Sequence, residues 1–214
     1  MSFIKKLKEA TSKEPINTHT METMVTASIL EFDLSAVIDN AELLLIIEQH
    51  KKDYPNSLKD YDERTNVNAW HSDWKTHLIN KKFDSFISKL ESCIKKYYPN
   101  AYLQDFWFNM YEELGSAKRH MHGPFQLSGV YFVECNENSS PLVIDNNHKN
   151  KETITIQPKP GKLVIFPGYV YHSVSKNKDS KKRISIAFNF CLECDRPSEE
   201  QIEERKKLCR GNND

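Results

Sequence analysis

The 214-residue sequence lacks the features that mark membrane, secreted or nucleic-acid-binding proteins. No apolar run approaches the roughly 20 residues that a membrane-spanning helix needs. Lysines at positions 5, 6 and 8 interrupt the stretch where a signal peptide would have its apolar core. The 30 basic and 30 acidic side chains cancel, so no overall field attracts nucleic acid or a membrane surface. We therefore expect an intracellular, cytoplasmic protein with no nucleic-acid or membrane partner.

Cysteine is also scarce. The five cysteines are an odd number and show no dense disulfide framework of the kind that holds small secreted domains together. The one close pair, Cys191 and Cys194, lies where a strand is expected to end. We expect both to be reduced thiols, in agreement with an intracellular location.

The two halves of the chain differ in periodicity. Residues 1–100 are expected to form a mainly helical flank, with helices after the cap residues Asp33 and Ser35 and across residues 83–97. Residues 24–30 are expected to form an edge strand, and residues 60–68 a loop. Residues 101–192 form the expected core, and residues 193–214 a C-terminal helix, capped by Ser198 with Gln201, and a tail. The length favours a single domain over residues 1–214.

From residue 101 the apolar period changes to two, which is typical of strands. The expected strands span residues 103–111, 126–134, 141–145, 153–157, 162–166, 169–175 and 183–192, and turn residues separate them. Seven short strands at this spacing indicate a mainly β protein with flanking helices, built as a sandwich or jelly roll rather than as a βαβ fold.

Three histidines are candidate metal ligands. His120 and His122 are two residues apart, so in a strand both side chains project from the same face. His172 lies on a later expected strand. Neutral imidazole binds iron, zinc, copper and nickel, and this pattern also fits a three-histidine zinc or cupin-type site.

Arg183 and Ser185 are candidate anion ligands. They lie on one face of a strand whose other face, with Ile184, Ile186 and Phe188, should pack beneath the helices of the first half. A buried arginine is costly unless it meets an anion. Its planar fork beside a hydroxyl suits one end of a dicarboxylate, although an internal ion pair or an exposed position would explain it too.

Together these motifs resemble the Fe(II)/2-oxoglutarate-dependent oxygenases, and most closely a subfamily found in marine phages and bacteria. The resemblance spans roughly residues 60–190. The motifs that carry it are NVNAWHS at 66–72, WFNMY at 107–111, HMH at 120–122, SGVYF at 128–132, PGKLVIFP at 160–167 and, eleven positions after His172, RISIAFN at 183–189.

The resemblance implies a double-stranded β-helix (a cupin-like jelly roll) packed against the N-terminal helices. It also implies Fe(II), the cosubstrate 2-oxoglutarate and O₂, with Arg183 and Ser185 holding the cosubstrate's distal carboxylate. Tyr131 and Asn109 are further candidate contacts to the cosubstrate.

One position departs from the family pattern, because His122 stands where the family usually has Asp or Glu. We expect His120, His122 and His172 to hold the metal as a three-histidine centre. A water, or a carboxylate such as Asp145 or Glu134, could complete the site instead.

The expected activity is a hydroxylase-type dioxygenase reaction that releases succinate and CO₂. The alternatives are a cupin-like three-histidine metalloenzyme that does not use 2-oxoglutarate, and a non-catalytic module that binds metal or 2-oxoglutarate. The substrate would be a small molecule or a protein side chain. An exposed sheet edge makes a homodimer plausible.

Overall fold

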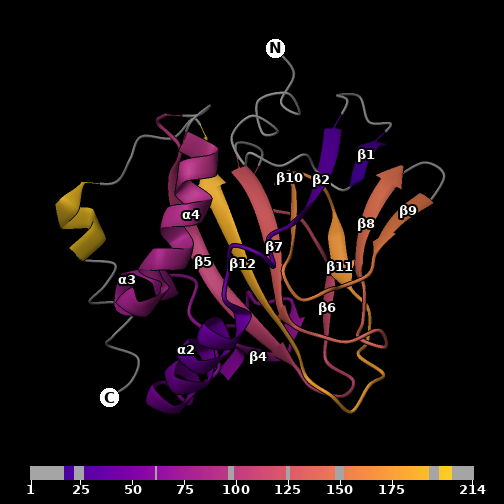
Figure 1. The fold of residues 1–214 in the computed structure, drawn as a ribbon, viewed down its shortest axis with the longest axis horizontal. Coiled ribbons are helices and arrows are strands. Elements are labelled where there is room, and N and C mark those ends of the chain that lie inside the picture. The colour runs from indigo at the N-terminus through magenta and orange to yellow at the C-terminus, as the bar shows by residue number, and fades with distance from the viewer. Residues whose placement is uncertain are drawn as a thin grey trace.

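The structure is a computed structural model of the chain. It describes residues 17–21, 27–60, 62–95, 99–123, 126–147, 152–192 and 198–203. Its described elements form two antiparallel β-sheets that face each other, with helices on the outer face of the larger sheet (Figure 1).

The larger sheet has the strand order β1-β2-β10-β7-β12-β5-β4. Its strands are β1 (Asn17–Met21), β2 (Ala27–Asp33), β4 (Trp70–His71), β5 (Tyr102–Tyr111), β7 (Gln126–Glu134), β10 (Lys162–Pro167) and β12 (Arg183–Cys191). Strand β12 pairs with both β5 and β7, so the arginine-bearing strand lies inside the sheet and not at its edge.

The smaller sheet has the order β3-β6-β11-β8-β9. Its strands are β3 (Val67–Asn68), β6 (Ser116–His120), β8 (Leu142–Asn147), β9 (Glu152–Ile156) and β11 (His172–Val174). His120 on β6 lies directly opposite His172 on β11. Strands that are far apart in the sequence therefore bring two candidate ligands together.

In the part of the chain that the structure describes, helices α2 (Asn40–Asp53), α3 (Thr76–Ile79) and α4 (Asp84–Lys95) lie on one side of this sandwich (Figure 1). The described 3₁₀ turns are η1 (Leu58–Asp60) and η2 (Lys81–Phe83). Asp39 caps α2, since its carboxylate accepts hydrogen bonds from the backbone N–H groups of Ala41 and Glu42.

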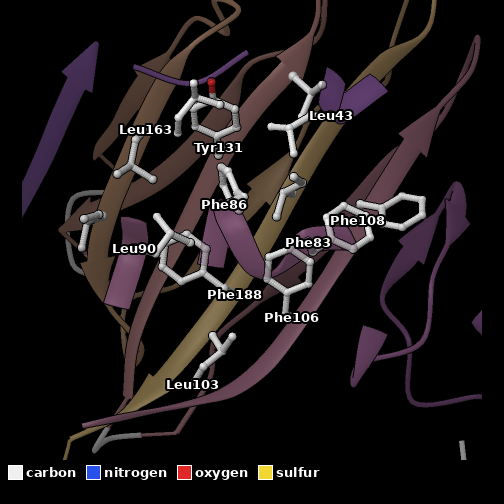
Figure 2. Packing of buried hydrophobic residues seen from close by; sticks show 14 of the residues in the cluster. Leu43, Phe83, Phe86, Leu90, Leu103, Phe106, Phe108, Tyr131, Leu163 and Phe188 are labelled. Carbon is white, nitrogen blue, oxygen red and sulfur yellow. The ribbon is translucent and has the colours of Figure 1, made fainter. Parts of the chain in front are cut away.

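An aromatic core joins the helices to the larger sheet (Figure 2). Phe83 and Phe86 of the helical region pack against Phe106 of β5, and Phe188 of β12 belongs to the same cluster. Gly129 on β7 leaves room for the Phe188 ring, because a Cβ atom at this position would overlap it. Full burial of a large apolar side chain contributes about 1.5–3 kcal/mol, so this layer supplies much of the stability.

A second apolar cluster lies between the two sheets and includes Phe132, Ile144, Val164 and Phe166. The two clusters use alternate residues of the same strands, as the pleat of a β-strand requires. The fold is thus a double-stranded β-helix packed against helices from the first half of the chain, and the predicted fold class is confirmed.

Most strands of the second half match the prediction, and β7 has the predicted bounds. Strand β6 was missed because Lys118 and Arg119 break its apolar alternation. The expected edge strand at 24–30 is described from residue 27 as β2, which lies inside the sheet, between β1 and β10. Residues 24–26 lie outside the described residues.

The helix expected after Asp33 begins later, at Asn40. The Asp33 carboxylate instead closes a turn, accepting hydrogen bonds from the N–H and hydroxyl of Ser35. The division into a helical flank at 1–100 and a core at 101–192 stays a prediction, although β1 to β4 all come from the flank.

At the C-terminal end, Ser198 and Gln201 exchange the two hydrogen bonds of the expected capping box. The expected tail after residue 203 lies outside the described residues. Cys191 is disulfide-bonded, so the expectation of a reduced thiol at this position is wrong. Among the described residues, no helix has both the length and the apolar composition needed to cross a membrane.

Candidate metal and cosubstrate site

The three candidate histidines meet between the two sheets. Their ligand nitrogens all lie within 4.8 Å of one another. His120 and His172 are cross-strand partners, and a backbone bond from His122 N–H to the Gly168 carbonyl brings the third ring beside them. A metal–nitrogen bond is about 2.0–2.1 Å long, so small ring rotations would bring all three nitrogens onto one ion.

Two of the rings are oriented by the backbone. His120 Nδ1 lies 2.7 Å from the Lys118 carbonyl oxygen, and His172 Nδ1 lies 3.0 Å from that of Val170. A carbonyl oxygen only accepts, so each Nδ1 carries the proton and each Nε2 keeps its lone pair. This is the tautomer that a metal needs at Nε2.

Side chains surround the third ring instead. The Nδ2 atom of Asn189 lies 3.5 Å from His122 Nδ1 and donates a 3.1 Å hydrogen bond to Asp105. Lys75 lies 2.6 Å from the same carboxylate, and the Ser128 hydroxyl donates to the side-chain amide oxygen (Oδ1) of Asn189. Asp105 is thus a carboxylate near His122, separated from it by one amide group.

Burial keeps the cluster uncharged. It lowers the pKa of His120, and it lowers the pKa of His122 to about 4, helped by His120 and opposed by Asp105. Burial, followed by the neighbouring His120 and His122, holds the pKa of His172 well below its usual value. At neutral pH the three imidazoles are therefore available to bind a divalent cation.

Arg183 lies in the same cavity and is fully buried. One of its terminal nitrogens lies 3.4 Å from the Ser185 hydroxyl, and the guanidinium carbon lies 4.8 Å from the Tyr111 ring centre and 5.0 Å from that of Phe132. Its Nε and second terminal nitrogen have no hydrogen-bond partner among the described residues. Burial lowers the pKa of Arg183, but arginine stays protonated in proteins, so this is a buried cation in need of an anion.

The cavity is shared by two of the candidate histidines and the arginine. His120 and His172 line it, as do Arg183 and Ser185, and Asn109 lies on its wall with a buried, unpartnered side-chain oxygen. The structure therefore brings together six of the seven residues singled out from the sequence: His120, His122, His172, Arg183, Ser185 and Asn109.

The expectation that Tyr131 contacts the cosubstrate is wrong. Tyr131 belongs to the core beneath the helices, as Figure 2 shows, and its hydroxyl donates a 2.6 Å hydrogen bond to Asn40. Its neighbours Val130 and Phe132 face the other sheet, and strand alternation turns Tyr131 away from the cavity. The motif match was correct, but the residue points toward the helices.

The carboxylates considered as alternative ligands lie elsewhere. Asp145 forms a 2.6 Å ion pair with Arg119. The preceding residue, Ile144, faces the other sheet, so strand alternation turns the Asp145 side chain away from the cavity. Glu134 is exposed at the end of β7. Among the described residues, the group that could hold a metal contains histidines alone.

Three aromatic neighbours of this site were not among the candidates drawn from the sequence. His71 is fully buried beside Trp74 and Trp107, and these two tryptophans line the cavity. The available signal was the position of His71 and Trp107 inside the motifs at 66–72 and 107–111.

The sequence model of the family described as "Putative 2OG-Fe(II) oxygenase" matches residues 105–189, which contain all the residues of the histidine and arginine site. This segment is less than half of the chain, and over it the sequence is similar to that oxygenase family. The protein is an Fe(II)- and 2-oxoglutarate-dependent oxygenase, and its residues suit both groups: three neutral imidazoles for the cation and an unpaired buried guanidinium for a carboxylate.

Solved structures share the fold. A prolyl hydroxylase from Trichoplax adhaerens, in complex with a hypoxia-inducible-factor peptide, has a TM-score of 0.60 at 13% identity, over 77% of this chain and 84% of that one. A prolyl-4-hydroxylase from Pseudomonas putida has a TM-score of 0.55 at 15% identity, over 78% and 93%.

The nogalamycin-biosynthesis epimerase SnoN, in complex with Fe³⁺, α-ketoglutarate and nogalamycin RO, has a TM-score of 0.58 at 8% identity, over 76% and 78%. A comparison with curated protein sequences gave no match. At these identities the solved structures establish the fold alone, and they include both hydroxylases and an epimerase.

Proposed function

We propose that this oxygenase is a hydroxylase-type dioxygenase in which His120, His122 and His172 hold Fe(II), and Arg183 with Ser185 holds the distal carboxylate of 2-oxoglutarate. Bound iron, with 2-oxoglutarate and O₂, would supply the oxidising chemistry, in which the keto acid leaves as succinate and CO₂. The chain's own residues would bind and orient the metal and the cosubstrate and keep water away from them.

The observation that carries the proposal is the state of Arg183. A fully buried guanidinium with two unpartnered nitrogens is unfavourable by itself, so its retention beside the histidines calls for an anion in this cavity. A carboxylate can accept from the free Nε and terminal nitrogen together, in the bidentate geometry that arginine favours. Ser185 can donate its hydroxyl to the same carboxylate.

The apolar lining of the cavity is consistent with a short aliphatic ligand. Leu142, Val174 and Ala187 line the same cavity as His120, His172 and Arg183. Methylene groups suit this surface, and a ligand here would exclude water from the metal. Asn109, with its unpartnered oxygen, is a polar contact on the same wall.

The proposal is tested by succinate formation in air with Fe(II) and 2-oxoglutarate, comparing wild type with Arg183→Met and Arg119→Met. Arg119 is the matched control because it lies one residue from His120 but pairs with Asp145, half-exposed. We expect Arg183→Met to abolish the slow, substrate-free succinate release and Arg119→Met to keep it.

Equal succinate release by both variants would show that Arg183 does not bind the cosubstrate. Tight metal binding without any succinate in wild type would favour a three-histidine metal protein that does not use 2-oxoglutarate. Hydroxylase chemistry is then tested on substrates by mass, since hydroxylation adds one oxygen atom and epimerisation adds none.

A further inference from the structure

His71 projects toward the site from the edge of the larger sheet. It lies on β4 directly opposite Asn109 on β5. Cross-strand partners share a face, and Asn109 lines the cavity, so His71 lies on the cavity side as well. Backbone bonds hold this segment firmly, since Ser72 N–H donates to the Phe108 carbonyl and the Ser57 hydroxyl accepts from His71 N–H.

The hydrogen-bonding state of His71 follows from its partners. Its Nδ1 contacts the Ser72 carbonyl oxygen, which only accepts, so Nδ1 carries a proton. Burial lowers the pKa of His71 to about 4, so the ring is neutral at pH 7. Its Nε2 therefore offers a lone pair, and this atom is buried without a partner among the described residues.

Trp107 supplies the complementary atom. It lies two residues from Asn109 on the same face of β5, its ring is parallel to His71 at 5.9 Å, and its centre is 6.0 Å from His122. The indole N–H of Trp107 is buried and unpartnered too. One acceptor and one donor are thus carried by two parallel rings, one of which lies beside His122.

Trp74 completes an aromatic wall at this end of the cavity. Its ring lies 4.5 Å from His71 and 4.8 Å from Trp107. Arg183 is the one charged side chain among the described residues that line the cavity, and the proposed function assigns it to the cosubstrate. The carboxylate of Asp62 accepts a hydrogen bond from Trp74 and acts electrostatically on His71, but it is already paired with Arg64. A charged group at the aromatic end would therefore lose its hydration without an unpaired partner among the described residues.

We propose that His71, Trp74 and Trp107 form the primary-substrate subsite, and that it binds an uncharged planar group carrying adjacent N–H and C=O groups, such as a lactam or amide. The inference rests on the proposed function and names the substrate class for the same site. The group's N–H donates to His71 Nε2, its C=O accepts from Trp107 N–H, and its flat face packs against Trp74.

The pairing explains two buried polar atoms that are otherwise unsatisfied. Each such atom is destabilising unless a ligand or an ordered water meets it. A water could bridge a donor and an acceptor as well, so the test separates a water from a lactam.

The test uses 2-pyridone, a planar lactam, and N-methyl-2-pyridone, which has the same ring without the N–H. Both are titrated into protein loaded with Zn(II) and 2-oxoglutarate, and binding is followed by the NMR signal of the Trp107 indole N–H. The sequence has three tryptophans, so single Trp→Phe variants assign the three indole signals.

In wild type we expect 2-pyridone to shift the Trp107 signal and to bind at least about 10-fold more tightly than its N-methyl analogue. His71→Phe, which keeps an aromatic ring but lacks Nε2, should abolish this preference. His77→Phe is the matched control, because His77 is another histidine of lowered pKa but packs near Phe106, on the helix-covered face. It should keep the preference.

Equal binding of the two probes in wild type would overturn the proposal without recourse to any variant. So would a Trp107 N–H that shows contact with bound water and no shift with either probe. If 2-oxoglutarate binds the metal-loaded protein but 2-pyridone does not, this inference fails alone. If 2-oxoglutarate does not bind, the proposed function fails.

Discussion

The two faces of the larger sheet are built from the same strands but differ in how completely their groups are satisfied. On β12, Ile184, Ile186 and Phe188 face the helices and are closely packed. The alternate residues Arg183, Ser185 and Asn189 face the other sheet and are equally buried. Strand β5 repeats the pattern, with Phe106 and Phe108 on one face and Trp107 and Asn109 on the other.

The helix-covered face is mainly apolar, although the buried Nδ1 of His77 lacks a hydrogen-bond partner among the described residues. The cavity face holds unpartnered polar atoms of four buried residues: His71, Trp107, Asn109 and Arg183. A protein retains such atoms at a functional site because ligands satisfy them. The comparison teaches that stability is concentrated on one face of the sheet and recognition on the other, and the two can be perturbed separately.

Removing a ring from the helix-covered face should have the largest effect on stability. Phe106 is fully buried and contacts Phe83 and Phe86, so Phe106→Ala should lower the free energy of unfolding by about 3–5 kcal/mol. Urea unfolding measures this. Leu45→Ala, at a 73% exposed residue of α2, is the control and should change stability by less than about 0.5 kcal/mol. A similar loss in both variants would contradict a separate stability layer.

Lowering the pH should destabilise the helix-covered side of the protein through protonation of His50. This histidine contacts Tyr54 and Phe108, and burial lowers its pKa from 6.5 to about 4, against a small opposing effect of Asp53. Between these values the unfolded chain binds the proton and the folded chain does not, so stability falls as pH falls from about 6.5 to about 4. The shift corresponds to a loss of about 3 kcal/mol.

The measurement is urea unfolding at pH 7 and pH 4 for wild type and His50→Phe. The variant should lose less stability on acidification by about that amount, because it has no group to protonate at this position. An identical pH dependence in both proteins would show that His50 does not contribute.

On the cavity face, metal should stabilise the protein by binding. Zn(II) at 100 times its dissociation constant should raise the free energy of unfolding of wild type by about 2.7 kcal/mol, and a chelator should reverse the gain. His172→Ala should lose the gain, since the His172 ring lies 4.3 Å from that of His120 and 5.1 Å from that of His122 and is 5% exposed. An undiminished gain in this variant would place the metal elsewhere.

The smallest effect on stability is expected at a partly exposed ion pair that belongs neither to the helix-covered core nor to the cavity. Asp145→Asn breaks the ion pair between Asp145, whose side chain is 20% exposed, and Arg119, whose side chain is 50% exposed. The change should alter the free energy of unfolding by less than about 1 kcal/mol. Metal affinity should stay within threefold of wild type. A large loss of affinity, measured by chelator competition, would instead place Asp145 among the ligands.

Much of this arrangement could be predicted from the sequence, because strand alternation is a local property. The pattern of residues 183–190 assigned Arg183 and Ser185 to one face and the apolar residues to the helix-covered face, as the structure has them. The pairing of His120 with His172 depends on strands about fifty residues apart, and the sequence suggested a shared metal without showing that these two strands pair.

Other features depend on tertiary contacts that one sequence does not display. Strand β6 has no apolar alternation, and its pairing with β3 and β11 forms it. Tyr131 lies in a matching motif, but its direction follows from the pleat of β7. The aromatic wall of His71, Trp74 and Trp107 forms only when β4 joins β5.

The central claim is that the three histidines and Arg183 form one site for Fe(II) and 2-oxoglutarate. The most direct test is anaerobic: Fe(II) and then 2-oxoglutarate are added to metal-free protein while the visible charge-transfer band of a chelated keto acid is recorded. Wild type should give a band that saturates at one equivalent of metal, and Arg183→Met should need at least about 10-fold more 2-oxoglutarate. Tightly bound iron with no band in wild type would contradict the account.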